Sequence, residues 1–527
     1  MATKRKYPAG IQDFVSLRQD GYIYVDKTEI IYKMITEGKP YFLSRPRRFG
    51  KSLLISTIAA IFEGRREIFE EFTTESGIVQ PQLFIAQTDW KWEKYPVFRF
   101  DFSAGDLTDI EQLDKLIDFT LHTYEEQYGI KPDVSDPNIR MITLLRTAHA
   151  QTGKRVVVLV DEYDNFILHS IGNKEKTELA RRRFQDVFGP LKREDEHLQF
   201  VFITGISKFS QMGIFSKLNN LSMQPAFDAI CGISEEELVT VFRQDIEMLG
   251  QANGLTYEEQ LQEVKDMYDG YHFSERMTDM YNPFSLINVL KSEKVSSYWF
   301  DRGTSSALID MLAQMPPVDM TDIEDNVYSS TMFDLPFEGF DDPLPILYQS
   351  GYLTIKNYSR EYDDYSLGFP NKEVRQGFAE CLYRHVTARN TSSDSALFRA
   401  FKLFQRNDNL ADFIEALKVF FAGVPYHLDN RNEHHYHALL YTLLTAFGAD
   451  IRAEEPSAKG RADLVLLVPK GIYIIELKYD GTADEALAQI EQKAYADKYR
   501  HDGRPITKVG IAFSSEERNI IEWKTSK

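Results

Sequence analysis

The feature that most constrains the fold is a short apolar run, a basic loop and an apolar-rich helical pattern between residues 41 and 64. Residues 41–43 predict a strand that ends at Ser44, and residues 53–62 predict a helix closed by Gly64. The loop between them ends in Gly-Lys-Ser, so the helix opens directly on these residues. Because a helix start presents unpaired N–H groups and a positive dipole end, this order predicts a phosphate-binding loop.

Four residues are expected to form the centre of this site. Lys51 is expected to contact the β- and γ-phosphates of ATP, and the Ser52 hydroxyl is expected to bind Mg²⁺. Phe49 and Gly50 precede them and complete the nucleotide-binding set. Gly-Lys-Ser alone is also compatible with a plain turn before a basic helix, so the prediction needs support from elsewhere in the chain.

The loop departs from the standard P-loop spacing at its first position. That spacing requires glycine at position 45, where this chain has Arg45, and the following Pro46 has no N–H group. The loop backbone therefore offers fewer donors to phosphate. We expect Arg45, Arg47 or Arg48 to supply positive charge in their place.

A second strand ends in two acidic residues about 110 positions further on. Residues 156–160 are a continuous apolar run, and Asp161 and Glu162 follow directly. At the carboxyl edge of a parallel sheet such residues face the ligand crevice. We expect Asp161 to hold Mg²⁺ through water and Glu162 to polarise the attacking water. The alternative is a core strand that runs into a solvated acidic turn.

Two further elements of an ATPase site have candidate residues. Thr204, near the end of the apolar run 200–206, is the predicted γ-phosphate sensor, with Ser207 in reserve; a hydroxyl that caps a strand end is the alternative. The run 181–183 of three arginines and Arg302 are candidates for an arginine finger. For the arginine run, the simpler interpretation is a solvated helix face.

The apolar runs and helical patterns together predict an α/β fold. Four short apolar runs alternate with helical patterns in the first 230 residues, which is typical of a parallel sheet with helices between its strands. A helical and winged-helix-like region, a helical linker and an α/β domain follow. The predicted boundaries are 1–230, 231–375, 376–426 and 427–527.

Three motifs of the first part resemble the AAA-ATPase-like family of P-loop proteins. They are Tyr24-Val25-Asp26-Lys27-Thr28, the loop from Ser44 to Ser52, and Asp161-Glu162-Tyr163-Asp164. The resemblance implies that arginine at position 45 is usual, and that the loop is altered rather than damaged. It also implies ATP as the ligand and Mg²⁺ as its metal.

The last hundred residues predict a second site on a helix and a hairpin. Residues 431–447 have the apolar spacing of an amphipathic helix, with Glu433 near its start. Two apolar strands joined by a short turn follow, and they carry Asp463 on the first and Glu476 and Lys478 on the second. Residues 476 and 478 differ by two, so their side chains point to the same face.

This residue set suits metal-assisted cleavage of a phosphodiester. Glu433, Asp463 and Glu476 are candidate ligands for Mg²⁺, which prefers oxygen. Lys478 is expected to orient or activate water, and Gln489 on the following helix is expected to support the site. Charges on buried strands are costly unless they are paired or metal-bound. The alternative is an edge hairpin with solvated charges, or a plain Glu476–Lys478 ion pair.

This segment resembles nucleases of the PD-(D/E)XK superfamily, in which a helix, an Asp, a Glu-x-Lys and a following Gln appear in the same order. The resemblance implies a restriction-endonuclease-like fold. Ala462 rather than proline precedes Asp463. The histidines at 434, 435 and 437 are interpreted as surface or supporting residues and not as a transition-metal site.

Charge and composition limit the partners. Of the net charge of −19, little belongs to residues 427–527, which have 14 Lys and Arg against 16 Asp and Glu. We therefore expect nucleic acid, DNA ahead of RNA, at the C-terminal domain only. We expect no membrane span and no signal peptide, because no apolar run is long enough for either. Two isolated cysteines, Cys231 and Cys381, indicate neither a disulfide framework nor a metal site. A cytoplasmic protein, which can form a homo-oligomer, is expected.

Three functional hypotheses follow. The leading one is an ATP-gated or ATP-assisted endonuclease, acting in defence or in mobile-element biology. The second is a nucleotide-switched regulatory or nucleic-acid-binding protein with little turnover, which the acidic surface and the missing loop glycine favour. The third is a toxin whose nuclease is held inactive by the ATPase region.

Overall fold

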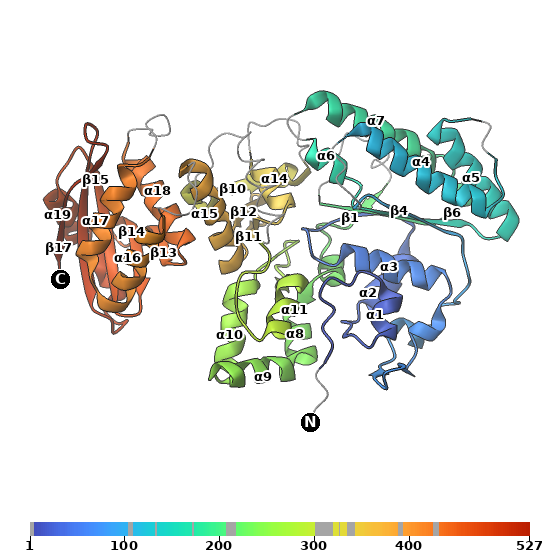
Figure 1. Cartoon of the computed structure of the whole chain (residues 1–527), viewed down its shortest axis with the longest axis horizontal. Coiled ribbons are helices and arrows are strands. Elements are labelled where there is room, and N and C mark those ends of the chain that lie inside the picture. Colours follow the sequence, from blue (N-terminus) through green and yellow to red (C-terminus); the bar gives the residue numbers. More distant parts are fainter. Residues whose placement is uncertain are drawn as a thin grey trace. The chain divides into compact units, whose positions relative to one another are not determined.

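The computed structural model describes most of the chain and divides it into two compact units. The first unit comprises Met1–Trp299 with Val327–Glu373, and the second comprises Phe300–Asn326 with Val374–Lys527. Both are mixtures of helices and strands, which confirms the predicted α/β class (Figure 1). The four predicted domain boundaries stay a prediction. The described residues are 5–103, 109–131, 134–170, 173–206, 218–300, 320–325, 327–334, 343–387, 394–424 and 432–527.

The first unit is built on a parallel sheet of five strands, as the apolar runs predict. Because all neighbouring pairs are parallel, the strands end at the same edge, where ligands bind in such folds. The last strand was not predicted, since its two asparagines give no apolar signal. The strand order is β4 (Val97–Asp101), β5 (Val156–Asp161), β6 (Leu198–Gly205), β1 (Pro40–Ser44) and β7 (Asn219–Asn220).

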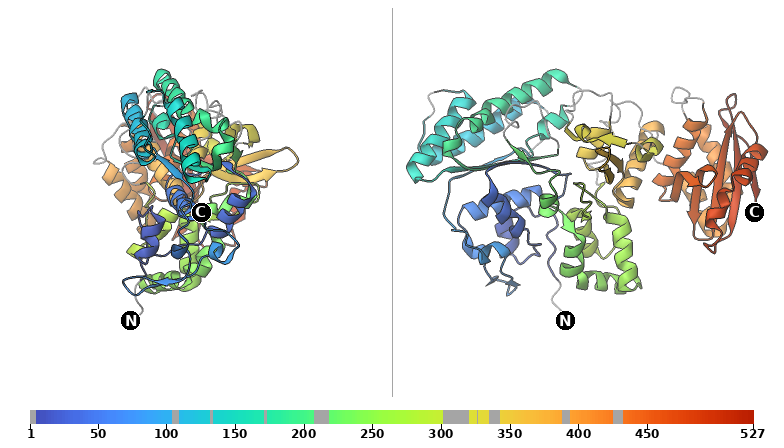
Figure 2. Two further views of the ribbon diagram at one scale, coloured as in Figure 1. Left: turned by 90° about the vertical axis from the view of Figure 1, so that its right-hand side faces the viewer. Right: turned by 180° about the vertical axis from the view of Figure 1, so that it is seen from behind.

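Helices cover both faces of this sheet (Figures 1 and 2). On one face lie α1 (Phe14–Gln19), α2 (Thr28–Glu37) and α3 (Lys51–Phe62), and on the other α4 (Ile110–Gln127), α5 (Pro137–Thr152) and α7 (Lys174–Phe188). The short α6 (Asn165–His169) follows β5, and β2 (Phe72–Thr73) pairs with β3 (Val79–Gln80).

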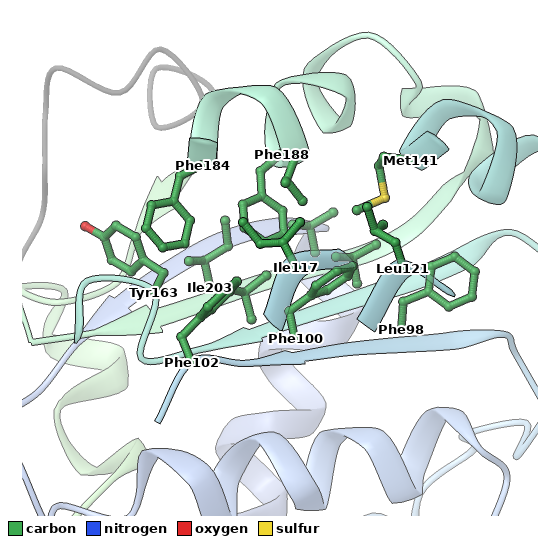
Figure 3. Close-up of a cluster of buried hydrophobic side chains, with 14 of the residues drawn as sticks. Phe98, Phe100, Phe102, Ile117, Leu121, Met141, Tyr163, Phe184, Phe188 and Ile203 are labelled. Atoms are coloured by element: carbon green, nitrogen blue, oxygen red, sulfur yellow. The ribbon is translucent and has the colours of Figure 1, made fainter. Parts of the chain in front are cut away.

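The core on the α4, α5 and α7 side is aromatic. Phe98, Phe100 and Phe102 alternate along and beyond β4 with exposed residues, so their rings point to one face. Phe184 and Phe188 of α7 lie one turn apart and close over them, with the rings of Phe102 and Phe184 5.0 Å apart (Figure 3). This packing fixes the sheet whose carboxyl edge carries the predicted site.

A helical region follows in the same unit, with α8 (Glu235–Val241), α9 (Arg243–Asn253), α10 (Tyr257–Tyr268) and α11 (Pro283–Ser292). Capping boxes start α8 at Ser234 and α10 at Thr256. The strand β8 (Ile233–Ser234) pairs with β9 (Met280–Tyr281).

The unit ends with a small antiparallel sheet of order β10–β12–β11. It comprises β10 (Val327–Ser329), β11 (Thr354–Ser359) and β12 (Asp364–Gly368), and α14 (Leu344–Gln349) precedes β11. A helix followed by two antiparallel strands is therefore present in the predicted region 231–375, and its winged-helix-like assignment stays a prediction.

The second unit is a mixed sheet of five strands with helices on both faces. Its centre is the predicted hairpin of β14 and β15, and β15 pairs parallel with β16. The helix α19 contacts β15, β16 and β17, while α18 contacts β13, β14 and β15. Within the described residues, no helix of the chain is long and apolar enough to cross a membrane. The strands are β13 (Asp450–Ser457), β14 (Gly460–Val468), β15 (Gly471–Tyr479), β16 (Ile506–Ser514) and β17 (Asn519–Ser526), and the helices are α13 (Met320–Asp325), α15 (Lys372–Thr387, from the boundary of the units), α16 (Asp394–Asn407), α17 (Leu410–Phe421), α18 (Glu433–Ala446) and α19 (Ala483–Lys493).

Candidate functional sites

The predicted phosphate loop connects β1 to α3 in the first unit. Gly50 precedes the helix with a φ of 93°, a left-handed conformation that glycine adopts at no steric cost. Lys51 is buried, and its Nζ donates to the carbonyl oxygens of Arg45 at 2.9 Å and Pro46 at 3.0 Å. Ser52 lies half-buried in the first turn of the helix. The loop thus wraps around the ammonium group that is predicted to meet phosphate.

The guanidinium of Arg45 is held by the protein itself. It is buried and donates to the carbonyl oxygens of Ser44 at 2.9 Å, Ser222 at 2.8 Å and Phe227 at 3.1 Å. It also lies 4.0 Å from the ring centroid of Phe273. Burial lowers the pKa of Arg45. These contacts favour a scaffold role that fixes the loop, and contact between Arg45 and phosphate stays a prediction.

The other loop side chains differ in what they reach. The Arg48 guanidinium donates to the carbonyl oxygen of Tyr298 at 3.2 Å and lies 4.0 Å from the ring centroid of Phe284. Phe49 is buried against other aromatic rings of the unit. Arg47 is half-buried, and its charge lowers the pKa of Glu162. Among the three predicted arginines, Arg47 is therefore the best placed to supply charge near the end of β5.

Asp161 and Thr204 are brought together at the ends of β5 and β6. Both are buried, and Thr204 Oγ1 donates to Asp161 Oδ1 at 2.7 Å. This bond fixes the carboxylate and favours a positioning role for Thr204 over direct sensing of phosphate. The sensor role stays a prediction, and the reserve candidate Ser207 lies outside the described residues.

Glu162 has an unusual backbone conformation. Its φ of 48° lies in the left-handed region, where residues other than glycine are uncommon and strained. Burial raises the pKa of Glu162, the positive charge of Lys51 lowers it, and the negative charges of Asp161 and Asp164 raise it. A partly desolvated carboxylate beside the loop lysine suits the predicted role in polarising water.

Asp164 is a feature that sequence reasoning quoted but gave no role. Its Oδ2 accepts a hydrogen bond from the Ile206 amide at 2.8 Å. A Cβ at Gly205 would lie 2.6 Å from Asp164 Oδ1, so only glycine fits there. Next along the chain, Asn165 Nδ2 donates to the carbonyl oxygen of Phe102 at 2.9 Å. The polar turn after β5 therefore ties together the ends of three strands.

The arginine-finger candidates are engaged locally. Arg182 pairs with Glu178 at 3.2 Å, and Arg183 pairs with Asp114 at 2.7 Å. Arg181 is buried on the core side of α7 rather than solvated, which differs from the simple expectation for a helix face. Arg302 lies outside the described residues.

The second unit brings its predicted residues to one place. Glu476 is fully buried on β15, and Lys478 Nζ lies 3.5 Å from Glu476 Oε1 and 4.0 Å from Glu433 Oε1. Asp463 Oδ2 accepts a hydrogen bond from the Leu477 amide at 2.7 Å, across the hairpin. Gln489 on α19 donates to Glu476 Oε1. The positions of these residues on the predicted hairpin thus indicated that their side chains lie close together.

The electrostatics of this cluster favour a bound cation. The pKa of Glu476 is raised to about 8, mainly by burial and also by the negative charge of Asp463, while the positive charge of Lys478 acts to lower it. Burial also raises the pKa of Asp463. Glu476 Oε2 is buried and has no hydrogen-bond partner among the described residues. An unpaired buried carboxylate oxygen is costly, so a positive ion beside it would be stabilising.

These donors fit a magnesium ion better than a transition metal. Within the described part of the chain, no three His, Cys, Asp or Glu side chains are grouped as a metal site. Mg²⁺ keeps several of its waters and is commonly bound through one or two carboxylates, so Asp463 and Glu476 are a sufficient pair. Glu433 Oε2 accepts a hydrogen bond from the Tyr479 amide at 3.2 Å, which holds a third carboxylate nearby.

Two further residues support this cluster: His437, one of the histidines interpreted as surface or supporting residues, and Tyr495, which was not predicted. His437 is buried, and its Nε2 is hydrogen-bonded to the carbonyl oxygen of Asp463 at 2.8 Å. Tyr495 is buried and hydrogen-bonds Gln489. The position of His437 on the predicted helix face was a usable signal, whereas the sequence gave none for Tyr495. Neighbouring His434 and His435 contact the rings of His437 and Tyr436.

The fold and the two clusters define a protein with a P-loop-like first unit and a nuclease-like second unit. Residues 8–215 match the model of a family described as predicted AAA-ATPase, and residues 431–523 match the PD-(D/E)XK nuclease superfamily. An uncharacterised protein in the vnfD 5′ region of Azotobacter chroococcum mcd 1 is 32% identical over 538 aligned positions, which cover 98% of each chain. The chain belongs to the AAA-ATPase-like family and carries a C-terminal PD-(D/E)XK domain, which confirms the resemblance.

Proposed function

We propose that this protein binds and hydrolyses ATP and couples it to Mg²⁺-dependent endonucleolytic cleavage of nucleic acid, DNA ahead of RNA. The observation that carries the nuclease half is the buried Glu476 oxygen without a partner, beside Asp463 and Lys478. A protein gains stability by removing such a group, so its presence indicates a function. Defence against foreign DNA or mobile-element biology is the setting that we propose.

Each residue of the cluster has a role in this proposal. Asp463 and Glu476 hold the metal, with Glu433 as a third carboxylate. Bound Mg²⁺ supplies polarisation of the scissile phosphate and a more acidic water. Lys478, 3.5 Å from Glu476, orients the attacking water and offsets negative charge on the phosphate. Gln489 fixes the orientation of the Glu476 carboxylate through its hydrogen bond.

The nucleotide half uses the edge of the first sheet. Lys51, now held by two loop carbonyls, exchanges them for phosphate oxygens. Ser52 and Asp161 hold the nucleotide's Mg²⁺, and Glu162 polarises the attacking water. Arg47 contributes charge from the loop.

The test is a cleavage assay on the full chain with plasmid, single-stranded DNA and RNA, each with and without ATP and Mg²⁺. We expect cleavage that requires Mg²⁺ and is altered by ATP. Asp463→Ala is expected to abolish it, and Asp450→Ala, an exposed aspartate at the start of β13, serves as its control. Cleavage that survives Asp463→Ala contradicts the nuclease proposal.

A second candidate function is a nucleotide-switched regulator with little turnover. It is favoured by the loop backbone, because the Arg45 N–H donates to the Gly205 carbonyl oxygen at 3.2 Å and Pro46 has no N–H. Fewer donors remain to stabilise charge on the transferred phosphate. An ATPase assay separates the two functions: a switch binds ATP tightly with negligible turnover, and Glu162→Gln then changes nothing measurable.

A further inference from the structure

The phosphate loop is bonded to the segment at which the chain first passes from one unit to the other. The first unit is interrupted after Trp299, and the residues that follow belong to the second unit. The Arg48 guanidinium donates to the carbonyl oxygen of Tyr298 at 3.2 Å. The indole N–H of Trp299 donates to the carbonyl oxygen of Arg47 at 3.4 Å. Two consecutive loop residues therefore contact the two residues that precede this crossing.

A buried carboxylate joins the same segment to a later crossing of the chain. Glu373 is the last residue of the first unit before the chain passes again to the second. Its Oε1 accepts hydrogen bonds from the backbone amides of Tyr298 and Trp299, the latter at 2.8 Å, and its Oε2 accepts one from the Ser285 hydroxyl at 2.7 Å. Burial raises the pKa of Glu373, while these hydrogen bonds and the positive charge of Arg48 act to lower it. Glu373 thus depends on a charge that the phosphate loop provides.

The helix that contains Glu373 continues into the second unit as α15. Two positions later on this helix, Arg375 donates to the Tyr441 hydroxyl and to the carbonyl oxygen of Ile451, the latter at 3.1 Å. Tyr441 lies on α18, the helix that begins at Glu433, and Ile451 lies on β13, which pairs with β14 of the hairpin. The start of α15 therefore connects the segment bonded to the phosphate loop with the framework of the second cluster.

Arg48 is the group in this chain of contacts that phosphate would displace. Its φ of 65° lies in the left-handed region, where residues other than glycine are uncommon and strained. Its guanidinium is held by a neutral carbonyl, that of Tyr298, and by the ring of Phe284. Hydrogen bonds from arginine to phosphate are roughly twice as strong as those between neutral groups. A triphosphate bound at Lys51, three positions along the chain, would therefore compete for this guanidinium.

We propose that Arg48 and Glu373 form a switch through which nucleotide bound to the first unit controls the second cluster. Without nucleotide, Arg48 bonds Tyr298 and its charge acts on Glu373. With ATP, the phosphates take the guanidinium, and Glu373 with the amides of residues 298 and 299 changes its arrangement at the start of α15. ATP shifts this equilibrium because it binds more tightly to the state in which Arg48 has left Tyr298. The inference rests on the proposed ATP-binding and nuclease functions and assigns residues to the coupling between them.

Trp299 reports on the switch directly. Its indole contacts the Arg47 carbonyl, and its ring lies 5.1 Å from the ring of Tyr352, so movement of the segment alters its surroundings. MgATP is expected to change the tryptophan emission of the full chain, and Trp299→Phe is expected to remove most of that change. ATP that binds by calorimetry without changing the emission, or with the same change in Trp299→Phe, overturns the switch. Absence of ATP binding overturns the nucleotide-binding function itself, so the two failures are distinguishable.

Glu373→Gln tests the carboxylate, because it removes the charge but keeps an oxygen that can accept the two amides. Less charge then holds Arg48 away from phosphate, so ATP is expected to bind about twofold or more tightly than to the wild type. A residue that merely supported the loop would have the opposite effect. ATP is expected to change the rate of nucleic-acid cleavage by about fivefold or more in the wild type and by less than about twofold in the variant.

Glu258→Gln is the matched control, because Glu258 is likewise the second residue of its helix, α10, but is exposed. It is expected to match the wild type in ATP affinity and in the response of cleavage to ATP. Unchanged or weaker ATP binding by a folded Glu373→Gln protein, or a wild-type cleavage rate that is independent of ATP, overturns the switch. Absence of any cleavage overturns the nuclease function instead, and the emission and affinity measurements then still decide whether the switch exists.

Discussion

At the start of α3 the ammonium of Lys51 is held by two loop carbonyls, whereas on β15 the carboxylate of Glu476 keeps one buried oxygen without a partner among the described residues. The carboxylate of Asp161 in the first site likewise accepts a hydrogen bond from the hydroxyl of Thr204. In the second site, burial raises the pKa of both Asp463 and Glu476, and the negative charge of Asp463 raises that of Glu476 as well. In the first site, Lys51 and Asp161 thus have hydrogen-bond partners within the protein, whereas in the second a buried carboxylate oxygen has none among the described residues, which favours a bound cation there.

This difference has a consequence for how each site responds to mutation. A group that the protein already satisfies contributes to stability, so its removal affects folding and binding together. A group that the protein leaves unsatisfied opposes stability, so its removal costs activity alone. The predictions below run from the largest expected effect to the smallest, and each one tests this contrast.

The largest effect is expected from Lys478→Ala. Loss of the ammonium beside Glu476 removes charge stabilisation of the reacting phosphate and is expected to reduce cleavage on the order of 10²–10³-fold. ATP affinity is expected to stay unchanged. Lys470→Ala is the matched control, because Lys470 is exposed in the turn at the other end of β15. Cleavage at the wild-type rate in Lys478→Ala would show that Lys478 has no role in the reaction.

Gln489→Ala is expected to have the next largest effect. The amide orients the Glu476 carboxylate, and residues that orient a metal ligand typically contribute about 10–100-fold in metal affinity or activity. The informative readout is the Mg²⁺ concentration for half-maximal cleavage, which is expected to rise, and which a merely structural residue would not change. Gln492→Ala, at an exposed position of the same helix, is expected to match the wild type.

Thr204→Val examines the corresponding support in the first site. The substitution keeps the shape but removes the hydrogen bond to Asp161, so the carboxylate that is proposed to hold Mg²⁺ loses its orientation. ATP turnover is expected to fall about tenfold or more, with a higher Mg²⁺ requirement. Thr143→Val is the control, because that exposed hydroxyl bonds only within its own helix, to Ile139. A normal Mg²⁺ requirement in Thr204→Val would reject the positioning role.

Glu476→Gln separates stability from activity. A neutral amide removes the cost of burying a charge beside Asp463, so the variant is expected to unfold at a higher temperature than the wild type in EDTA. Mg²⁺ at about ten times its Kd is expected to stabilise the wild type by about 1–2 kcal/mol and the variant hardly at all. Thermal unfolding with and without Mg²⁺ measures both. A lower midpoint for the variant in EDTA would contradict the view that Glu476 opposes stability.

Much of this arrangement was predictable from the sequence because it depends on local patterns. The apolar runs locate β1 and β5, and a loop residue after each run then lies at the ligand edge of the sheet. The period of two along a strand places Glu476 and Lys478 on one face, and the short turn brings Asp463 alongside. These inferences need only backbone geometry.

What the sequence could not predict depends on tertiary contacts. Lys27 and Glu237 form an ion pair although they are 210 residues apart, and nothing in either segment indicates the other. Tyr495 reaches Gln489 through the turn after α19. The direction of the Thr204 hydroxyl depends on the register between β5 and β6. In each case the residue type was visible and its partner was not.

Arg45 shows this limit most clearly, and Arg45→Lys gives the smallest expected effect. From the sequence, its position in a phosphate loop suggested a phosphate contact, but three carbonyl oxygens and the Phe273 ring hold its guanidinium. Lysine keeps the charge but cannot satisfy all three carbonyls or stack on the ring.

The substitution is therefore expected to lower the free energy of unfolding by about 0.5–1.5 kcal/mol and to leave ATP affinity nearly unchanged. Arg47→Lys is the comparison, because Arg47 is half-buried and its charge acts on Glu162. That variant is expected to affect ATP binding or turnover rather than stability. Denaturant unfolding and calorimetry on both variants decide between the roles. A stable Arg45→Lys protein with weakened ATP binding would instead indicate that Arg45 contacts the phosphates. The first site would then resemble the second, because each would contain a charged group that serves ligand binding rather than stability.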